Sequence, residues 1–149
     1  AWGRFEVAQA PHSEYALHYQ GKAWYEAGGD TILNDVQAQR ITCPVMVLST
    51  HRTASSAENF LLFFSYLKRG LIIGQSSFGS SGQPLTVDLP GGGYARICAK
   101  HETYYDGRRF IGCGVAPDVP TPLLLSDVLE TTDHTLEAAQ KLMQTRINR

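Results

Sequence analysis

The sequence predicts a single α/β domain over residues 1–149, and two observations support this fold class. A short apolar strand, an amphipathic helix and a second apolar strand follow one another between Pro44 and Gly74. A unit of this kind, about 30 residues long, is typical of two parallel strands joined by a right-handed crossover. Next come two further strand-like runs, Leu85–Leu89 and Tyr94–Ala99, which predict a hairpin because a Pro-Gly-Gly-Gly turn separates them.

The strand–helix–strand unit has clear expected boundaries. The first strand is expected over Pro44–Leu48 and buried on both faces, because it is continuously apolar. The helix is expected from about Ala54 to Arg69, with Gly70 as its stop and Leu71–Gly74 as the second strand. Its expected apolar stripe consists of Ala57, Phe60, Leu61, Phe64 and Leu67.

The two ends of the chain differ in how clearly they can be interpreted. Residues 1–40 show no sustained period of 2 or 3.6. Residues 133–147 predict a C-terminal helix, since apolar residues recur there at helical spacing. Its expected buried face consists of Leu136, Ala139, Met143 and Ile147.

Composition excludes several classes of function. The formal net charge is −1 and no run of Lys or Arg stands out, so we expect no nucleic-acid partner. The three cysteines lack Cys-x-x-Cys spacing, and the histidines and cysteines together lack the spacing of zinc ligands. We therefore expect no metal and no other cofactor. Cys98, in an apolar run, is expected to be a buried small hydrophobe.

Ser55 is the main candidate for chemistry, because it lies where the first strand turns into the helix. A hydroxyl there has the positive end of the helix dipole and unpaired backbone N–H groups beside it. Such donors stabilise the oxyanion that forms when a hydroxyl attacks a carbonyl. The alternative is a capping box, in which Ser55 caps the helix and Glu58 reaches back to it. Local chemistry alone leaves both readings open.

Five segments of the chain form an ordered set of short motifs. They are Pro44–Leu48 with Thr53–Glu58, Gly70–Gly74 with Ser77–Gly79, Leu89–Tyr94, Tyr105–Arg108, and Gly112–Val119. In this order they resemble the C-terminal processing (tail-specific) protease family of serine peptidases. The resemblance covers residues 44–120, the C-terminal helix at 133–147 fits the family's ending, and residues 1–40 are poorly matched.

The resemblance implies a crotonase/ClpP-like ββα architecture, of which this chain is the C-terminal portion of the catalytic domain. It also implies that Ser55 is the nucleophile and that the amide of Ser56 is an oxyanion donor. Glu58 would orient the site or contact substrate as part of the catalytic set. Ser80 would lie beside Ser55 in space. The implied substrate-binding residues are Gly79, Ser80 and Gln83.

The chain departs from many family members at one position. They carry Phe-Gly-Lys, whose lysine is the general base, whereas this chain has Ser80 after Phe78-Gly79. A serine hydroxyl cannot replace an amine as base. The chain therefore resembles the lysine-lacking branch, which includes tricorn protease and the modules of interphotoreceptor retinoid-binding protein. His51 is the histidine nearest to Ser55 in sequence, but nothing in the sequence orients it, and the base stays open.

The function that the resemblance implies is a serine endopeptidase that hydrolyses polypeptides through an acyl-enzyme at Ser55. This chain alone is expected to be inactive, because the base and the second oxyanion donor would come from the remainder of the peptidase domain upstream. One alternative is a non-catalytic module that binds a peptide or an apolar ligand on the same fold. Another is an unrelated crotonase-like acyl-CoA enzyme. Oligomeric state and compartment stay open, although exported family members favour a periplasmic or extracytoplasmic location.

Overall fold

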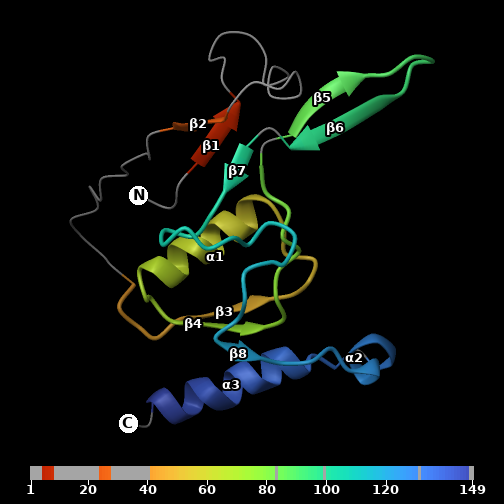
Figure 1. The fold of residues 1–149 in the computed structure, drawn as a ribbon. Coiled ribbons are helices and arrows are strands. Elements are labelled where there is room, and N and C mark those ends of the chain that lie inside the picture. Colours follow the sequence, from red (N-terminus) through yellow and green to blue (C-terminus); the bar gives the residue numbers. More distant parts are fainter. Residues whose placement is uncertain are drawn as a thin grey trace.

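The computed structural model describes residues 5–8, 24–27, 41–82, 84–98, 100–130 and 132–147. Within these residues the chain forms a mixed α/β fold, as the sequence predicts (Figure 1). Its elements are β1 Phe5–Ala8, β2 Trp24–Ala27, β3 Met46–Ser49, α1 Ser56–Tyr66, β4 Leu71–Gly74, β5 Pro84–Asp88, β6 Tyr94–Cys98, β7 Lys100–Glu102, β8 Val119–Pro120, α2 Leu125–Leu129 and α3 His134–Ile147.

A parallel sheet of order β3-β4-β8 lies at the centre of the described fold. Strand β3 pairs with β4 from Met46↔Leu71 to Ser49↔Gly74, which confirms the predicted strand–helix–strand unit. Helices α1 and α3 cover opposite faces of this sheet (Figure 1). The carboxyl ends of β3 and β4 therefore lie at one edge, the place where open α/β sheets usually carry their sites.

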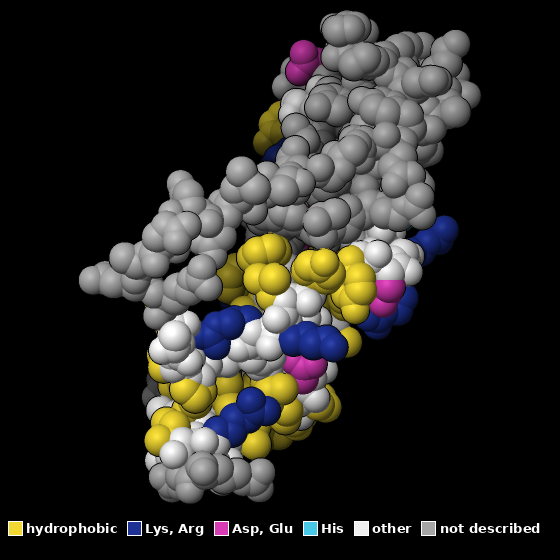
Figure 2. Space-filling model, turned by 90° about the vertical axis from the view of Figure 1, so that its left-hand side faces the viewer, with side chains coloured by type: hydrophobic (Ala, Val, Ile, Leu, Met, Phe, Trp, Pro, Cys, Tyr) yellow, Lys and Arg dark blue, Asp and Glu magenta, His cyan; other side chains and the backbone are white. Residues whose placement is uncertain are grey.

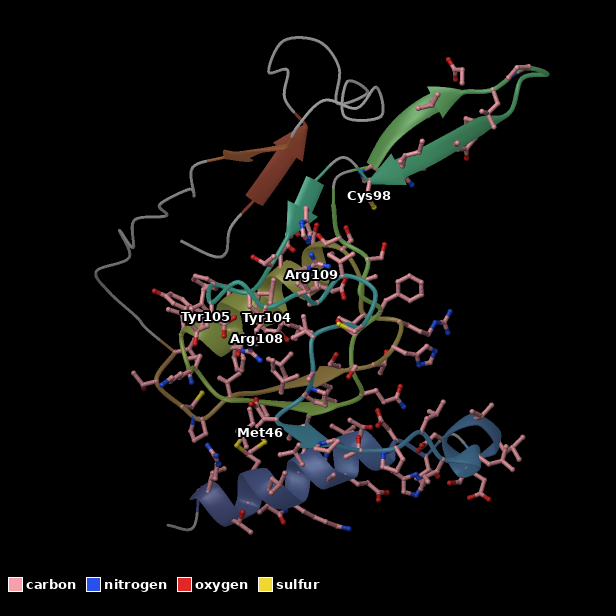
Figure 3. All side chains as sticks on the ribbon, viewed as in Figure 1. Met46, Cys98, Tyr104, Tyr105, Arg108 and Arg109 are labelled. Atoms are coloured by element: carbon pink, nitrogen blue, oxygen red, sulfur yellow. The ribbon has the colours of Figure 1, made fainter. Side chains whose placement is uncertain are left out.

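Two antiparallel sheets complete the described part. Strands β5 and β6 form the predicted hairpin, and they project away from the body of the molecule (Figure 1). Strands β2, β1 and β7 form the third sheet in that order. The C-terminal end of the hairpin, at Cys98, comes back close to the body of the molecule (Figure 3).

Helix α1 begins where the sequence predicts but ends earlier. Ser55 is its N-cap and Tyr66 its last residue, so the expected end at Arg69 is wrong. The N–H of Arg69 donates to the carbonyl of Phe64 (3.3 Å), and Lys68 has a φ of 49°. This is a Schellman ending in which Lys68, not Gly70, takes the left-handed position.

Gly70 is needed for another reason. A Cβ at this position would lie 1.9 Å from the carbonyl oxygen of Val45, so only glycine allows this approach to the chain leading into β3. The strand itself is less buried than expected. Leu48 is 38% exposed while Ser49 is fully buried, so β3 is not covered on both faces.

The hydrophobic core lies between α1, β4 and the segment 104–115. Its buried members are Leu61, Leu62, Phe64, Ile72, Tyr104, Phe110 and Val115. The expected stripe of α1 is rotated, because Phe60 and Leu67 are 51% and 52% exposed. The buried face of the helix instead carries Glu58 and Leu62 beside Leu61. A carboxylate therefore occupies a position in the core.

Helix α3 confirms the predicted C-terminal helix but not all of its buried face. The Asp133 carboxylate caps it by accepting from the N–H of Leu136 at 2.8 Å. Ala139 is buried, whereas Leu136 and Ile147 are 42% and 65% exposed. No helix within the described ranges is long and apolar enough to cross a membrane.

Aromatic rings and an arginine pack together near the labels of Tyr104, Tyr105 and Arg108 in Figure 3. The rings of Tyr66 and Tyr105 meet edge to face at 4.9 Å, and the guanidinium of Arg108 lies 4.5 Å from the centre of the Tyr104 ring (Figure 3). Figure 2 looks at the left-hand side of the molecule in Figure 1, where bands of hydrophobic side chains alternate with Lys and Arg. These contacts anchor the segment that leads towards Phe110.

Candidate active site

Ser55 has a backbone conformation that an ordinary N-cap does not need. Its φ is 58° and its ψ is −126°, whereas N-cap residues usually lie in the β region. Non-glycine residues in such sparsely populated regions cost about 1–3 kcal/mol and gather at functional sites. A strained, exposed serine directly before a helix shares this feature with a nucleophile elbow, although residues 50–55 here separate β3 from α1. Ser55 is exposed and its side chain makes no cap hydrogen bond.

The buried carboxylate of Glu58 holds this turn through hydrogen bonds. The carboxylate is 0% exposed and accepts four hydrogen bonds. Oε1 accepts from the hydroxyl of Ser77 (2.5 Å) and the N–H of Gly79 (2.6 Å). Oε2 accepts from the N–H groups of Ser80 (2.9 Å) and Ser55 (3.1 Å). Of the two roles expected for Glu58, orienting the site fits this burial and contacting substrate does not.

The loop after β4 is fixed in turn by the segment around residue 114. The hydroxyl of Ser77 accepts from the N–H of Val115 at 2.7 Å while it donates to Glu58. Gly114 has a φ of 80°, and a Cβ there would lie 2.0 Å from the carbonyl oxygen of Ser77. The N–H of Gly112 donates to the carbonyl of Gly79 at 2.8 Å. Two glycine-rich segments therefore fit together backbone to backbone and fix the loop beside Ser55.

Ser55 opens into a pocket of about 370 Å³. Its wall combines the turn before α1, the loop after β4 and the near end of the hairpin. The lining residues are Ala54, Ser55, Phe78, Ser80, Ser81, Gly82, Pro84, Arg96 and Cys98. Cys98 is exposed, so the expectation of a buried small hydrophobe is wrong. It lies at the end of β6 that returns to the body of the molecule (Figure 3), where it lines this pocket.

The structure brings together most of the residues that the sequence singled out. Ser80 lies beside Ser55 as predicted, because its carbonyl accepts from the N–H of Ser55 at 2.9 Å. The N–H of Ser56 has no partner within the described residues, so it is free to donate to a ligand. Gly79 is buried behind the pocket wall, with its N–H on Glu58. Gln83 lies outside the described residues.

A general base is not among the lining residues. No His or Lys lines the pocket in the part of the chain that the structure describes. His51 is held, contrary to expectation, because its Nδ1 lies 3.0 Å from Oε1 of Gln75, but it does not line the pocket. His134 pairs with Asp127 at 2.5 Å, at the junction of α2 and α3. The described residues also contain no group of three His, Cys, Asp or Glu that could hold a metal ion.

Sequence reasoning missed three residues near the pocket. Ser81 and Glu102 are 6% and 3% exposed, and the Ser81 hydroxyl donates to the Glu102 carboxylate. Arg96 lines the pocket together with Cys98. The sequence could have predicted that Arg96 and Cys98 lie on one face, since residues two apart in a strand point to the same side of the sheet. Nothing local marked Glu102.

Comparison with known proteins identifies the family. The sequence profile of peptidase family S41 matches residues 6–121, which is most of the chain. The chain belongs to peptidase family S41. This is the family of C-terminal processing proteases that the five sequence motifs indicated, so that prediction is confirmed. No curated protein sequence matches the chain significantly.

Several solved structures are similar in fold to this chain. A candidate peptidase from Parabacteroides merdae is 19% identical with a TM-score of 0.69, over 95% of this chain and 42% of that one. Mature CPAF complexed with lactacystin is 21% identical with a TM-score of 0.59, over 70% of this chain and 20% of that one. The photosystem II D1 C-terminal processing protease is 29% identical with a TM-score of 0.46, over 67% and 24%. The chain thus spans less than half of each of these proteins.

Proposed function

We propose that the protein is a serine endopeptidase that hydrolyses polypeptides through an acyl-enzyme at Ser55. The observation that carries this proposal is the strained backbone of Ser55, with φ 58° and ψ −126°, at the exposed start of α1. A plain cap would have neither the strain nor the free hydroxyl. Membership of peptidase family S41 supports the same reaction class.

In the proposed reaction the Oγ of Ser55 attacks the peptide carbonyl and gives its proton to a general base. The N–H of Ser56 donates to the oxyanion of the tetrahedral intermediate. The C–N bond then breaks, the amine leaves with the proton, and water hydrolyses the resulting ester. Glu58 is a positioning residue that holds Ser55 and Ser80 in place. The base and a second oxyanion donor come from elsewhere in the peptidase domain.

The finer architecture belongs to the same proposal. We propose a crotonase/ClpP-like ββα domain of which this chain forms the C-terminal portion, in the branch of the family without a catalytic lysine. Two observations support this. Ser80 stands at the position beside Ser55 where a lysine would serve as base. The chain also matches less than half of the length of its structural relatives.

One observation favours a second candidate function. No His or Lys lines the pocket within the described residues, so a module that binds peptide without cleaving it would have the same pocket. The two candidates differ in the reactivity of Ser55. A fluorophosphonate reacts with an activated serine, whereas a merely exposed serine stays unlabelled.

Labelling and cleavage of the full-length protein therefore test the proposal. Full-length protein should cleave an unfolded polypeptide and label at Ser55, whereas Ser55→Ala should do neither, and the isolated 149-residue chain should be inactive. Loss of one oxyanion donor costs about 10²–10³ in rate, and loss of the base costs about 10²–10⁴. Ser55→Ala should leave stability nearly unchanged, because the hydroxyl caps nothing. A folded full-length protein that neither cleaves nor labels would favour the binding module.

A further inference from the structure

Arg96 is the one basic side chain among the described residues that line the Ser55 pocket. It lies on β6 opposite Thr86 in the hairpin register, and its side chain is exposed. In the part of the chain that the structure describes, no carboxylate pairs with it. An arginine without a partner, on the wall of a pocket, offers five N–H donors to whatever enters.

Two buried carboxylates, Glu58 and Glu102, bind residues of the pocket wall but do not line the pocket. Glu58 is fully buried behind Ser55 and Ser80, where four donors already occupy its oxygens. Glu102 is 3% exposed behind Ser81, whose hydroxyl donates to it. A ligand in the pocket therefore meets a positive charge from Arg96, and the negative charges of Glu58 and Glu102 lie behind the wall.

We propose that Arg96 makes the Ser55 pocket a subsite for a carboxylate of the polypeptide substrate. A guanidinium binds a carboxylate through two parallel N–H···O hydrogen bonds, so it selects for charge and for shape. Phe78, 62% exposed on the same wall, provides an apolar surface beside it. The carboxylate is either an acidic side chain or the free C-terminus. The assignment rests on the proposed function only in taking a peptide as the ligand.

Binding measured without catalysis tests the subsite. Full-length Ser55→Ala protein is titrated with four fluorescent peptides of one sequence, carrying Glu or Gln at one position and a free or amidated C-terminus. We expect the best carboxylate peptide to bind about 10- to 100-fold more tightly than the peptide with neither group. A preference that follows the Glu residue identifies an acidic side chain, and one that follows the free C-terminus identifies the chain end.

Substitutions then link the preference to Arg96. Arg96→Gln should remove the preference for a carboxylate, and Arg96→Lys should restore part of it. Arg96→Glu should reverse the preference, so that a fifth peptide with Lys at the varied position binds best. The matched control is Arg146→Gln on α3, an exposed arginine outside this pocket, which should leave all four affinities unchanged. Circular dichroism checks that each variant is folded.

The outcomes separate this inference from the proposed function. Equal affinity for the four peptides, no binding of any of them, or a preference that survives Arg96→Gln would overturn the subsite. A preference that depends on Arg96 in a full-length protein that neither cleaves nor labels would retain the subsite and refute the peptidase. Cleavage of acidic and neutral peptides at equal rates would refute the subsite alone.

Discussion

Replacing Glu58 by Gln should disrupt the site more than any other isosteric change. The carboxylate accepts four hydrogen bonds, two on each oxygen. The Gln amide has one oxygen and one NH₂ group, and the NH₂ group must face at least one backbone N–H whichever way the amide turns. If it replaces Oε2, it opposes the N–H groups of Ser55 and Ser80. If it replaces Oε1, it opposes the N–H of Gly79.

The size of the effect follows from this geometry. Hydrogen bonds to a charged group contribute about 1.5–3 kcal/mol each, so losing one or two costs about 1.5–6 kcal/mol. The upper end of this range approaches the whole stability of a typical domain, about 5–15 kcal/mol. Glu137→Gln, on the first turn of α3, is the matched control and should change stability by no more than about 0.5 kcal/mol.

Two measurements check Glu58→Gln. Urea denaturation gives the loss of stability, and hydrogen exchange shows whether it is local. The amides of Ser55, Gly79 and Ser80 should lose protection, because each donates to Glu58. Fluorophosphonate labelling of Ser55 in the folded fraction should fall with them. A variant within 0.5 kcal/mol of wild type, with these amides still protected, would refute the positioning role of Glu58.

Three further changes have expected directions. Ser49→Ala should raise the free energy of unfolding by about 1 kcal/mol, because the fully buried Ser49 hydroxyl has no partner among the described residues; a lower urea midpoint would contradict this. Lys68→Gly should raise the free energy of unfolding by about 0.5–1 kcal/mol, because glycine takes the left-handed conformation at φ 49° without strain. An unchanged or lower melting temperature would contradict this. The backbone N–H of His134, above all, lowers the pKa of Asp127 from 3.8 to about 2. The hydrogen bond that the imidazole donates to the Asp127 carboxylate raises the pKa of His134 above 6.5. The contribution of the Asp127–His134 pair to the free energy of unfolding is therefore full between pH 3.8 and 6.5. It is lost as the pH falls towards 2 or rises through the raised pKa of His134. The melting temperature of wild type minus that of His134→Gln, measured against pH, should follow this profile, and a flat difference would exclude it.

The sequence was sufficient for elements whose causes are local. The apolar runs on either side of α1 predicted the parallel pair. The helix start at Ser55 followed from the Ser-x-x-Glu pattern, in which Glu58 accepts from the N–H of Ser55. The hairpin followed from its turn. The proximity of Ser80 to Ser55 is a long-range fact, and family resemblance supplied it where periodicity could not.

What the sequence could not predict depends on distant partners. The buried face of α1 is rotated because Glu58 finds its donors in the loop after β4, and helical spacing carries no information about that loop. Cys98 was expected in the core because its neighbours are apolar, yet the projecting hairpin exposes it. The strained φ of Ser55 has no local signature either, since a capping box and a nucleophile elbow can share the same letters.

The contact between Ser77 and Val115 sets an order of events during synthesis. Strand β3, α1 and β4 are complete once Gly74 has been added, and they can pair through short-range contacts. The hydroxyl of Ser77 cannot receive its hydrogen bond until Val115 exists, 38 residues further along the chain. The loop that holds Ser55 through Glu58 is therefore completed late. A half-made chain therefore carries Ser55, the proposed nucleophile, without the Val115 hydrogen bond that helps to hold the loop beside it.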